Sequence, residues 1–297
     1  MRNSFKRPAA GLAAAGLALS LAACGSSDKS SSTATPTPAA SATVVKVTKV
    51  PASVKSFSVA TDASYPPNEF IKTGTSSTVV GMDADLGAAL AKQLGIPVSI
   101  KNATFDGIVP GIASGKYNVG MSSITDNTTR QKSVDFVDYY SAGTSFYVKA
   151  DGGPTINTLA DLCGQKAAAE SGTTQQSDIA AQAKKCKAAG KPLTQLTFPS
   201  QTGVNTALNA GRATVGMADS PVAAYQVKQS GGTFKLGGTY GAAPYGIALA
   251  KNSPLVQPTL AALKVLIANG TYTKILTKWG VQSGAIKTPV INGGTGS

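Results

Sequence analysis

The chain has 297 residues, of which 42% are hydrophobic, and its formal net charge is +13 with no histidine. A chain without histidine cannot build a Ser-His-Asp triad, a Cys-His dyad or a histidine-ligated metal site, and we expect neither a metal nor a cofactor. The basic residues are scattered, without an arginine-rich run or interleaved aromatic residues, which favours a solvated surface over a nucleic-acid interface.

The first 23 residues have the pattern of a secretion signal. The basic start MRNSFKR precedes the apolar run PAAGLAAAGLALSLAAC, which is too short to be a comfortable membrane span. The run ends in Leu-Ala-Ala-Cys at Cys24, followed by Gly25, and this ending resembles the lipobox of bacterial lipoproteins. The resemblance implies cleavage before Cys24 and lipidation of its sulfur, so that the exported protein is anchored to the outer face of the cell membrane. A plain cleaved signal is the alternative.

Residues 24–55 are dominated by Ser, Thr, Pro and Ala and show no apolar periodicity. Such a segment cannot bury enough apolar surface to offset the conformational entropy that it would lose on folding. We therefore predict that it is a flexible tether between the lipid and the folded body.

The body beyond residue 55 alternates strand-like and helix-like patterns. Its longest helical pattern, at 81–95, places Met82, Leu86, Leu90 and Leu94 on one face and ends at a glycine. This alternation predicts an α/β protein with a mostly parallel sheet. The expected strands are 56–60, 98–100, 118–123, 145–149, 166–170, 194–198 and 213–218, and the expected helices are 81–95, 105–115, 174–186, one around Asn205, 221–229, 255–270 and 271–280.

Two segments about a hundred residues apart resemble each other. The alignment that starts at Phe105 and at Gln201 pairs Gly107 with Gly203, Gly115 with Gly211, and Val119-Gly120-Met121 with Val215-Gly216-Met217. Two similar lobes would explain this repeat, and convergence of helix–turn–strand units is the alternative. Ligands of open α/β sheets gather beyond the carboxyl ends of the strands, which here are Ser122-Ser123 and Ala218-Asp219. Facing lobes would bring both ends into one cleft.

The polar residues at strand ends and helix starts have ordinary structural explanations when each is taken alone. Asp62 suits a turn or helix cap, Arg130 a surface charge, and Thr173 and Thr174 a helix N-cap. The aromatic residues Tyr65 and Phe105 are equally typical of a core.

Taken together, the same residues suit a free amino acid. Arg130 can bind a carboxylate through two parallel hydrogen bonds, and the backbone N–H groups of Thr173 and Thr174 at a helix N-terminus reinforce it. Asp219 can supply the counter-charge for an α-ammonium group. The frame is completed by the hydroxyls of Ser122, Ser123 and Thr125, with Tyr65 and Phe105 as walls for the ligand side chain.

The order of motifs over residues 56–286 resembles the polar amino-acid-binding proteins of ABC importers, solute-binding family 3. The motifs include TDASYPPNEF, FDGIVPGIASGKYNVGMSSITDNTTRQKSVDF, DLCGQKAAAESGTTQ, AGRATVGMADSPVAA and NGTYTKILTKWG. The resemblance implies a two-lobed periplasmic-binding-protein-like type II fold, in which a two-strand hinge joins two mostly parallel sheets flanked by helices. It places lobe 1 at 56–140 and 245–286, lobe 2 at 145–238, the hinge at 141–144 and 239–244, and a C-terminal tail at 287–297.

The resemblance also implies a role for individual residues. Asp62 and Tyr65 face the ligand side chain, and Gln175 lies near the carboxylate site. Glu170 departs from the family pattern, in which an apolar residue or Gln is common, and an acid there beside Asp62 favours a cationic or amide side chain. The complete predicted ligand-binding set is Asp62, Tyr65, Phe105, Ser122, Ser123, Thr125, Arg130, Glu170, Thr173, Thr174, Gln175 and Asp219. We expect a monomer that closes over the amino acid and delivers it to a membrane permease with its ATPase, without catalysis.

Two cysteines remain besides Cys24. Because an exported chain meets oxidising surroundings, we predict a disulfide between Cys163 and Cys186. It would close a loop of about two dozen residues and stabilise the fold by roughly 3 kcal/mol. Two free buried thiols are the alternative, and the absence of CxxC spacing argues against a redox role.

Two other classes of function stay open. An enzyme on the same fold, such as a prephenate- or arogenate-type dehydratase, needs a general acid, for which Glu170 or Asp62 are candidates. A sensor that signals through a partner protein is the third class. Turnover of candidate substrates would favour the enzyme, and neighbouring permease and ATPase genes would favour the importer.

Overall fold

The computed structural model describes residues 49–296, which fall within one compact unit. The predicted signal sequence, the lipidation site Cys24 and most of the predicted tether lie outside the described residues. At the end of that tether, Val50 and Val54 pack against the neighbouring hydrophobic core. The described part of this segment therefore packs against the folded body, whereas the sequence predicted a flexible tether as far as residue 55.

An eight-stranded sheet with the order β5-β1-β6-β11-β7-β10-β8-β9 runs through the body. Parallel pairing joins β5, β1 and β6 at one side, and β10, β8 and β9 at the other. The bounds are β1 (Phe57–Thr61), β5 (Val98–Asn102), β6 (Val119–Gly120), β7 (Val134–Lys149), β8 (Lys166–Glu170), β9 (Thr194–Phe198), β10 (Val215–Asp219) and β11 (Phe234–Ala250).

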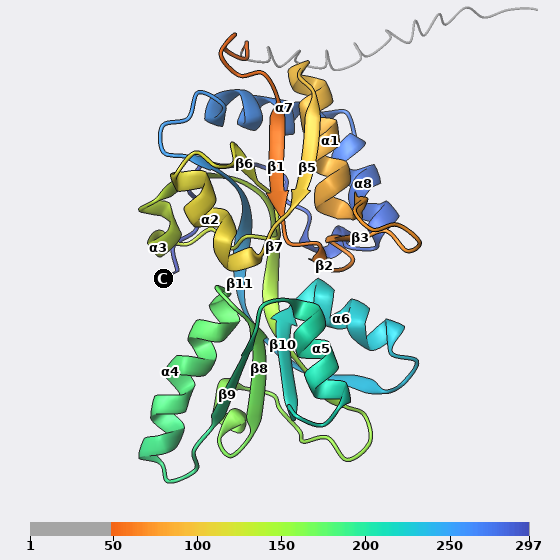
Figure 1. Cartoon of the computed structure of the whole chain (residues 1–297), viewed down its shortest axis with the longest axis vertical. Helices are drawn as coiled ribbons and strands as arrows, with labels where there is room; N and C mark the ends of the chain where they lie inside the picture. Colours follow the sequence, from red (N-terminus) through yellow and green to blue (C-terminus); the bar gives the residue numbers. More distant parts are fainter. Residues whose placement is uncertain (1–48, 297) are drawn as a thin grey trace, which may run out of the picture. The chain divides into compact units, whose positions relative to one another are not determined.

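The two long strands β7 and β11 pair antiparallel and belong to both groups (Figure 1). The Ala248 end of β11 pairs with β6, whereas the Phe146 end of β7 pairs with β10. The parallel strands β5, β1 and β6 form lobe 1 with one end of the long pair, and β10, β8 and β9 form lobe 2 with the other. The register of the pair shifts between Leu236 and Thr239 and again between Tyr240 and Ala243, which are irregularities of the kind that bend strands. The predicted two-lobed architecture with mostly parallel strands is confirmed, and the two joining strands make the sheets of both lobes one continuous sheet.

Helices cover the sheet in both lobes (Figure 1). The helical face predicted for α1, with Met82, Leu86, Leu90 and Leu94, is buried in the lobe 1 core. None of the described helices is both long and apolar enough for a membrane span. The bounds are α1 (Met82–Leu94), α2 (Phe105–Ala113), α7 (Val256–Ala268) and α8 (Thr271–Trp279) in lobe 1, and α4 (Thr174–Ala188), α5 (Gln201–Asn209) and α6 (Ser220–Gln229) in lobe 2.

The internal repeat corresponds to α2–β6 in lobe 1 and α5–β10 in lobe 2. The N–H of Tyr117 donates to the carbonyl of Gly111 in the first copy, and the N–H of Ala213 donates to the carbonyl of Ala207 in the second. These hydrogen bonds occupy equivalent alignment positions, and a glycine with positive φ follows each helix. The two segments therefore fold alike.

Cys163 and Cys186 form a disulfide with their Cα atoms 5.1 Å apart, which confirms the predicted pairing. The bridge joins the residue after the short 3₁₀ helix η1 (Leu159–Leu162) to the last turn of α4. It thus fixes the C-terminal end of the helix whose N-terminus carries Thr173 and Thr174.

Several elements were not predicted from the sequence. A second sheet of three short strands, β2 (Ser64–Tyr65), β3 (Glu69–Ile71) and β4 (Val79–Val80), lies in lobe 1. The short helix α3 (Thr128–Gln131) carries Arg130. After the 3₁₀ helix η2 (Gln282–Gly284), residues 287–297 were expected to be a tail, but a bridge from Ile291 to Val137 attaches their described part to β7.

Candidate ligand-binding site

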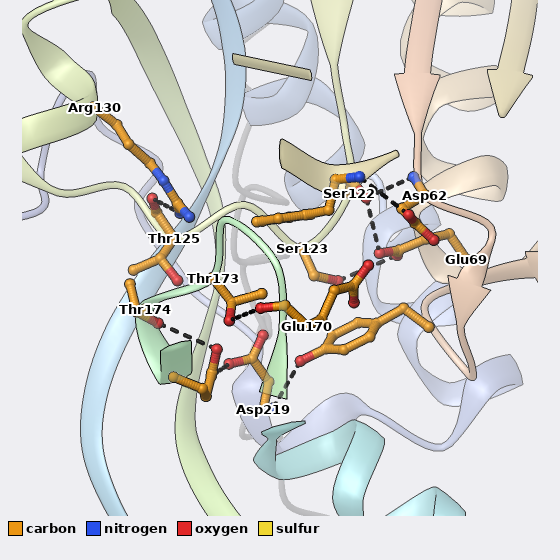
Figure 2. A pocket seen from close by; sticks show the side chains of 13 residues that line it. Asp62, Glu69, Ser122, Ser123, Thr125, Arg130, Glu170, Thr173, Thr174 and Asp219 are labelled. Carbon is orange, nitrogen blue, oxygen red and sulfur yellow. Dashed lines mark hydrogen bonds between the residues drawn. The ribbon is translucent and has the colours of Figure 1, made fainter. Parts of the chain in front are cut away.

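One cavity between the two lobes is lined by every residue of the predicted ligand-binding set, together with Glu69 (Figure 2). Asp62 follows β1 and Ser122 follows β6, whereas Glu170 and Asp219 are the last residues of β8 and β10. The carboxyl ends of strands from both lobes therefore meet at the cavity, as the sequence predicted. The cavity has a volume of about 10 Å³, which is room for about one water molecule.

Asp62 is buried and holds the start of α2. Its carboxylate accepts hydrogen bonds from the backbone N–H groups of Ser64 at 3.0 Å and Phe105 at 3.1 Å. Phe105 is the first residue of α2, so Asp62 places a negative group at a helix N-terminus. Asp62 therefore acts as a cap at the start of α2, and it also lines the cavity.

Ser122 and Ser123 form the lobe 1 wall next to Glu69. The hydroxyl of Ser122 accepts from the N–H of Asp62 at 2.8 Å and donates to Glu69 Oε1 at 3.3 Å. The hydroxyl of Ser123 donates to Glu69 Oε2 at 3.2 Å. Ser123 has a φ of 51°, and the carboxylate of Asp83 supports this unusual backbone by accepting from its N–H at 2.9 Å.

Arg130 lies at the opposite end of the cavity from Asp62 and Glu69 (Figure 2). Its guanidinium donates to the carbonyl of Thr125 at 2.8 Å and, across the lobes, to the carbonyl of Gly172 at 2.9 Å. It also lies over the ring of Phe105, 5.4 Å from the centroid. Burial lowers the pKa of Arg130 to about 10, so the group stays charged at neutral pH.

The N-terminus of α4 supplies the lobe 2 wall. The hydroxyl of Thr173 accepts from the N–H of Gln176 and donates to the carbonyl of Glu170 at 2.7 Å. Because the first N–H groups of a helix have no partner within it, this end of α4 suits a negative ligand group. Gln175, from the first turn, donates to Asp219 Oδ1 at 2.7 Å and fixes that carboxylate.

The two lobes also touch each other directly around the cavity. The N–H of Asp219 donates to the hydroxyl of Tyr65 at 2.8 Å, and the hydroxyl of Ser171 donates to Asp106 at 3.1 Å. These bonds and the Arg130 contact connect lobe 1 with lobe 2, so the structure describes a closed arrangement.

The acidic residues of the cavity have raised pKa values. Burial and then the negative charge of Asp62 raise the pKa of Glu170 to about 10. Burial, partly offset by the hydrogen bond from Gln175, raises the pKa of Asp219 to about 6. Burial also raises the pKa values of Asp62 and Glu69. Glu170 Oε1 is buried and has no hydrogen-bond partner among the described residues.

Glu69 is the cavity residue that the sequence reasoning missed. It stands in the quoted motif TDASYPPNEF, but a single Glu between Asn and Phe resembles any surface charge. Pairing of β2 with β3 places Glu69 opposite Tyr65, and its side chain is fully buried. Strands of two and three residues, such as β2 and β3, are too short for a periodicity from which this burial could be predicted.

Among residues 49–296, no cluster of acidic and cysteine side chains has an arrangement suited to a metal ion. Instead, the guanidinium of Arg130 lies at one end of the cavity and several carboxyl groups lie at the other. This set of charged and polar groups is complementary to a small zwitterion with an additional positive charge.

Comparisons with known proteins identify relatives of the chain. The family profile of bacterial extracellular solute-binding proteins, family 3, matches residues 57–282. The arginine-binding protein ArgT of Corynebacterium glutamicum is 32% identical over 231 residues, which cover 77% of this chain and 75% of that protein.

Two solved structures have a similar fold. An ancestral arginine-binding protein bound to arginine has a TM-score of 0.71 and 34% identity, over 76% of this chain and 98% of that one. An ancestral arginine-binding protein bound to glutamine has a TM-score of 0.70 and 36% identity, over 77% and 99% of the two chains. The relatives are named as binding proteins, and the fold is that of type II periplasmic binding proteins, as predicted. The chain belongs to the bacterial extracellular solute-binding proteins of family 3.

Proposed function

We propose that the protein is the substrate-binding lipoprotein of an ABC importer. We further propose that it captures a cationic L-amino acid and that arginine is its preferred ligand. The observation that carries the proposal is the polarity of the cavity. Arg130 occupies one end, whereas the buried carboxyl groups of Asp62, Glu69 and Glu170 gather away from it (Figure 2).

The α-carboxylate of the ligand binds at the Arg130 end. The guanidinium is held in place by the Thr125 carbonyl and by the face of Phe105. The N-terminus of α4, which begins at Thr174, supplies backbone N–H groups from the opposite lobe. A carboxylate between them is bound by both lobes at once.

The α-ammonium group binds at Asp219. This carboxylate lies at the end of β10, and Gln175 fixes its Oδ1 atom. A positive ligand group beside it lowers its pKa below the value of about 6 that burial produces. Both charges of the ligand backbone are then matched by opposite charges of the protein.

The ligand side chain points toward Glu170, Asp62 and Glu69. A buried carboxyl group is costly to ionise unless a positive partner lies close to it, and Glu170 Oε1 has a free hydrogen-bonding position. A guanidinium or ammonium group placed there stabilises the ionised acids and donates hydrogen bonds to them. The relatives that are named for arginine support the same choice.

Capture requires the lobes to separate. A cavity of about 10 Å³ cannot admit an amino acid, and direct bonds such as that from Asp219 to Tyr65 close it. The strand pair β7–β11 with its register shifts is the hinge about which the lobes open. A ligand that contacts both lobes binds the closed form better and shifts the population toward it.

Lipid anchoring at Cys24 and delivery to a permease with its ATPase complete the proposal. The lipobox-like sequence before Cys24 and the family membership support the anchor and the importer. Metabolic labelling with a fatty-acid analogue tests the anchor, because Cys24→Ser must abolish the label.

The central test is a thermal-shift screen of the exported protein against the twenty amino acids, followed by calorimetry. We expect the largest stabilisation from arginine, a smaller one from lysine, and none from aspartate or glutamate. A larger response to an acidic amino acid would contradict the assignment of Glu170, and no response to any amino acid would refute the function.

The dehydratase alternative has one specific observation in its favour. With a pKa raised to about 10, Glu170 is protonated at neutral pH and has the state that a general acid needs. Turnover of prephenate or arogenate by the wild-type protein, lost in Glu170→Gln, would support this second function.

A further inference from the structure

The chain end that the sequence suggested to be a tail forms a C-terminal strap, which we define as residues 290–296. It follows the first half of β7, where the Val290 carbonyl accepts from Asp138 N–H and the N–H of Asn292 donates to Phe136. Asn292 also accepts from the N–H of Phe136 through its side chain at 2.8 Å.

Beyond β7 the strap binds the segment that carries Arg130. The side chain of Gln131 donates to the Gly294 carbonyl at 2.8 Å, and the N–H of Gly294 donates to Asp126 at 2.9 Å. The N–H and the hydroxyl of Thr128 both donate to the Gly296 carbonyl, at 2.8 and 3.1 Å. Residues on both sides of Arg130 are therefore attached to the strap.

The hinge strand β11 holds the same segment from another direction. The N–H of Asp126 donates to the Pro244 carbonyl at 2.9 Å, and Thr125 forms a bridge with Tyr245. Thr125 in turn accepts the hydrogen bond of the Arg130 guanidinium. The position of the guanidinium thus depends on a short segment clamped between the hinge and the strap.

Two glycines allow the strap to approach so closely. A Cβ atom at Gly294 would lie 2.1 Å from the backbone oxygen of Asp126, and one at Gly293 would lie 2.5 Å from a carboxylate oxygen of Asp138. The first contact involves backbone and cannot be relieved by a side-chain rotation. The strap and the Arg130 segment are therefore in direct contact at Gly294.

We propose that the C-terminal strap is a positioning element for Arg130 and thereby sets the affinity for the α-carboxylate of the ligand. This inference rests on the proposed function, because it assigns Arg130 to that carboxylate. None of the strap residues lines the cavity. The strap acts through the segment 125–131 and not by touching the ligand.

The test compares Gly294→Ala with Gly296→Ala in the full chain. A methyl group at Gly296 meets nothing within 4 Å, so the control changes the same segment without a clash. We expect Gly294→Ala to weaken arginine binding about tenfold in calorimetry and Gly296→Ala to leave it within twofold.

Argininamide, which lacks the carboxylate charge, separates positioning of Arg130 from general damage. If the strap acts through Arg130, Gly294→Ala weakens argininamide binding much less than arginine binding. Equal losses for both ligands would show a merely structural role and overturn the proposal. Gln131→Leu removes the side-chain hydrogen bond to the Gly294 carbonyl, and it must show the same larger loss for arginine than for argininamide if Gly294→Ala does not fold.

A measurement without ligand distinguishes this inference from the proposed function. Hydrogen exchange of the amides in residues 125–131 must become faster in Gly294→Ala, while exchange in β1 stays unchanged. If the wild-type protein binds no amino acid, the proposed function fails. If it binds arginine but Gly294→Ala changes neither exchange nor affinity, the strap proposal fails.

Discussion

The hydroxyl of Tyr65 accepts a 2.8 Å hydrogen bond from the backbone N–H of Asp219. Tyr65 belongs to the small sheet of lobe 1, and Asp219 ends β10 of lobe 2. The bond closes the lobes at the residue proposed to hold the α-ammonium group. Closure and ligand recognition therefore share one residue, and changes that hinder closure are expected to weaken binding without contacting the ligand.

Gly172→Ala is expected to hinder closure. A Cβ atom at Gly172 would lie 2.8 Å from the Cα atom of Asp106 in the opposite lobe. We expect arginine affinity to fall about tenfold, because the closed form loses population. The matched control is Gly164→Ala, since both glycines have positive φ but a methyl group at Gly164 meets nothing within 4 Å. Equal affinities of the two variants in calorimetry would contradict this closure contact.

Arg130→Ala is expected to weaken binding strongly while the fold persists. Truncating one partner of a buried charge pair costs about 2–5 kcal/mol, so the affinity should fall by roughly thirtyfold to several thousandfold. Arg212→Ala is the control, because Arg212 is exposed and lies over Phe198, away from the cavity. Unchanged affinity of Arg130→Ala, with a circular dichroism spectrum like that of wild type, would eliminate the carboxylate clamp.

Glu170→Gln is expected to change selectivity. The amide cannot take up the negative charge that Glu170 acquires beside a bound cation, so arginine affinity should fall by roughly ten- to a hundredfold while glutamine affinity stays similar or rises. Asp151→Asn removes an equal charge from an exposed loop and should leave both affinities unchanged. If Glu170→Gln retains wild-type preference for arginine in competition calorimetry, Glu170 does not face the ligand cation.

Arginine binding is expected to release a proton at neutral pH. In the closed protein the pKa of Glu170 is about 10, so the group is protonated at pH 7.5. A ligand guanidinium lowers this pKa, the complex binds fewer protons than the free protein, and affinity must rise with pH below about 10. Calorimetry in buffers of different ionisation enthalpy measures the release. The release should be smaller in Glu170→Gln than in wild type, and uptake of a proton would have the wrong sign.

Reduction of the disulfide is expected to lower the melting temperature. Opening the Cys163–Cys186 loop, with its sequence separation of 23 residues, should cost about 3 kcal/mol. For a body of this size that corresponds to a decrease of roughly 10 °C. The double variant with serine at both positions should melt like the reduced protein and show no further effect of reductant. Two free thiols in the oxidised, exported protein, detected by mass spectrometry, would contradict the pairing.

The sequence predicted those parts of the fold that have strong periodicity. The Met82–Leu94 helix face, the alternation of strands and helices, and the disulfide are present as expected. The structure also gathers the predicted ligand-binding residues around one cavity, because they stand at strand ends and helix starts that the α/β pattern locates. Their roles toward a ligand stay predictions.

The remaining parts depend on contacts between distant residues. The strands β2 and β3 have only two and three residues and therefore no readable periodicity, so neither the second sheet nor the burial of Glu69 on β3 could be predicted. The strap contains Gly293 and Gly294, which alone indicate a loop. Only the tertiary structure reveals that these glycines make room for Asp138 and Asp126.

The pairing of β7 with β11 has a consequence for protein engineering. Thr144 and Tyr240 are register partners where the chain enters and leaves lobe 2, so both junctions lie about 5 Å apart, one strand spacing. The residues between these two junctions form one continuous segment of the chain. The corresponding segment of a relative with another specificity can therefore replace it through two junctions that lie side by side. A fluorescent reporter fused at one junction would convert the movement of the lobes into an optical signal.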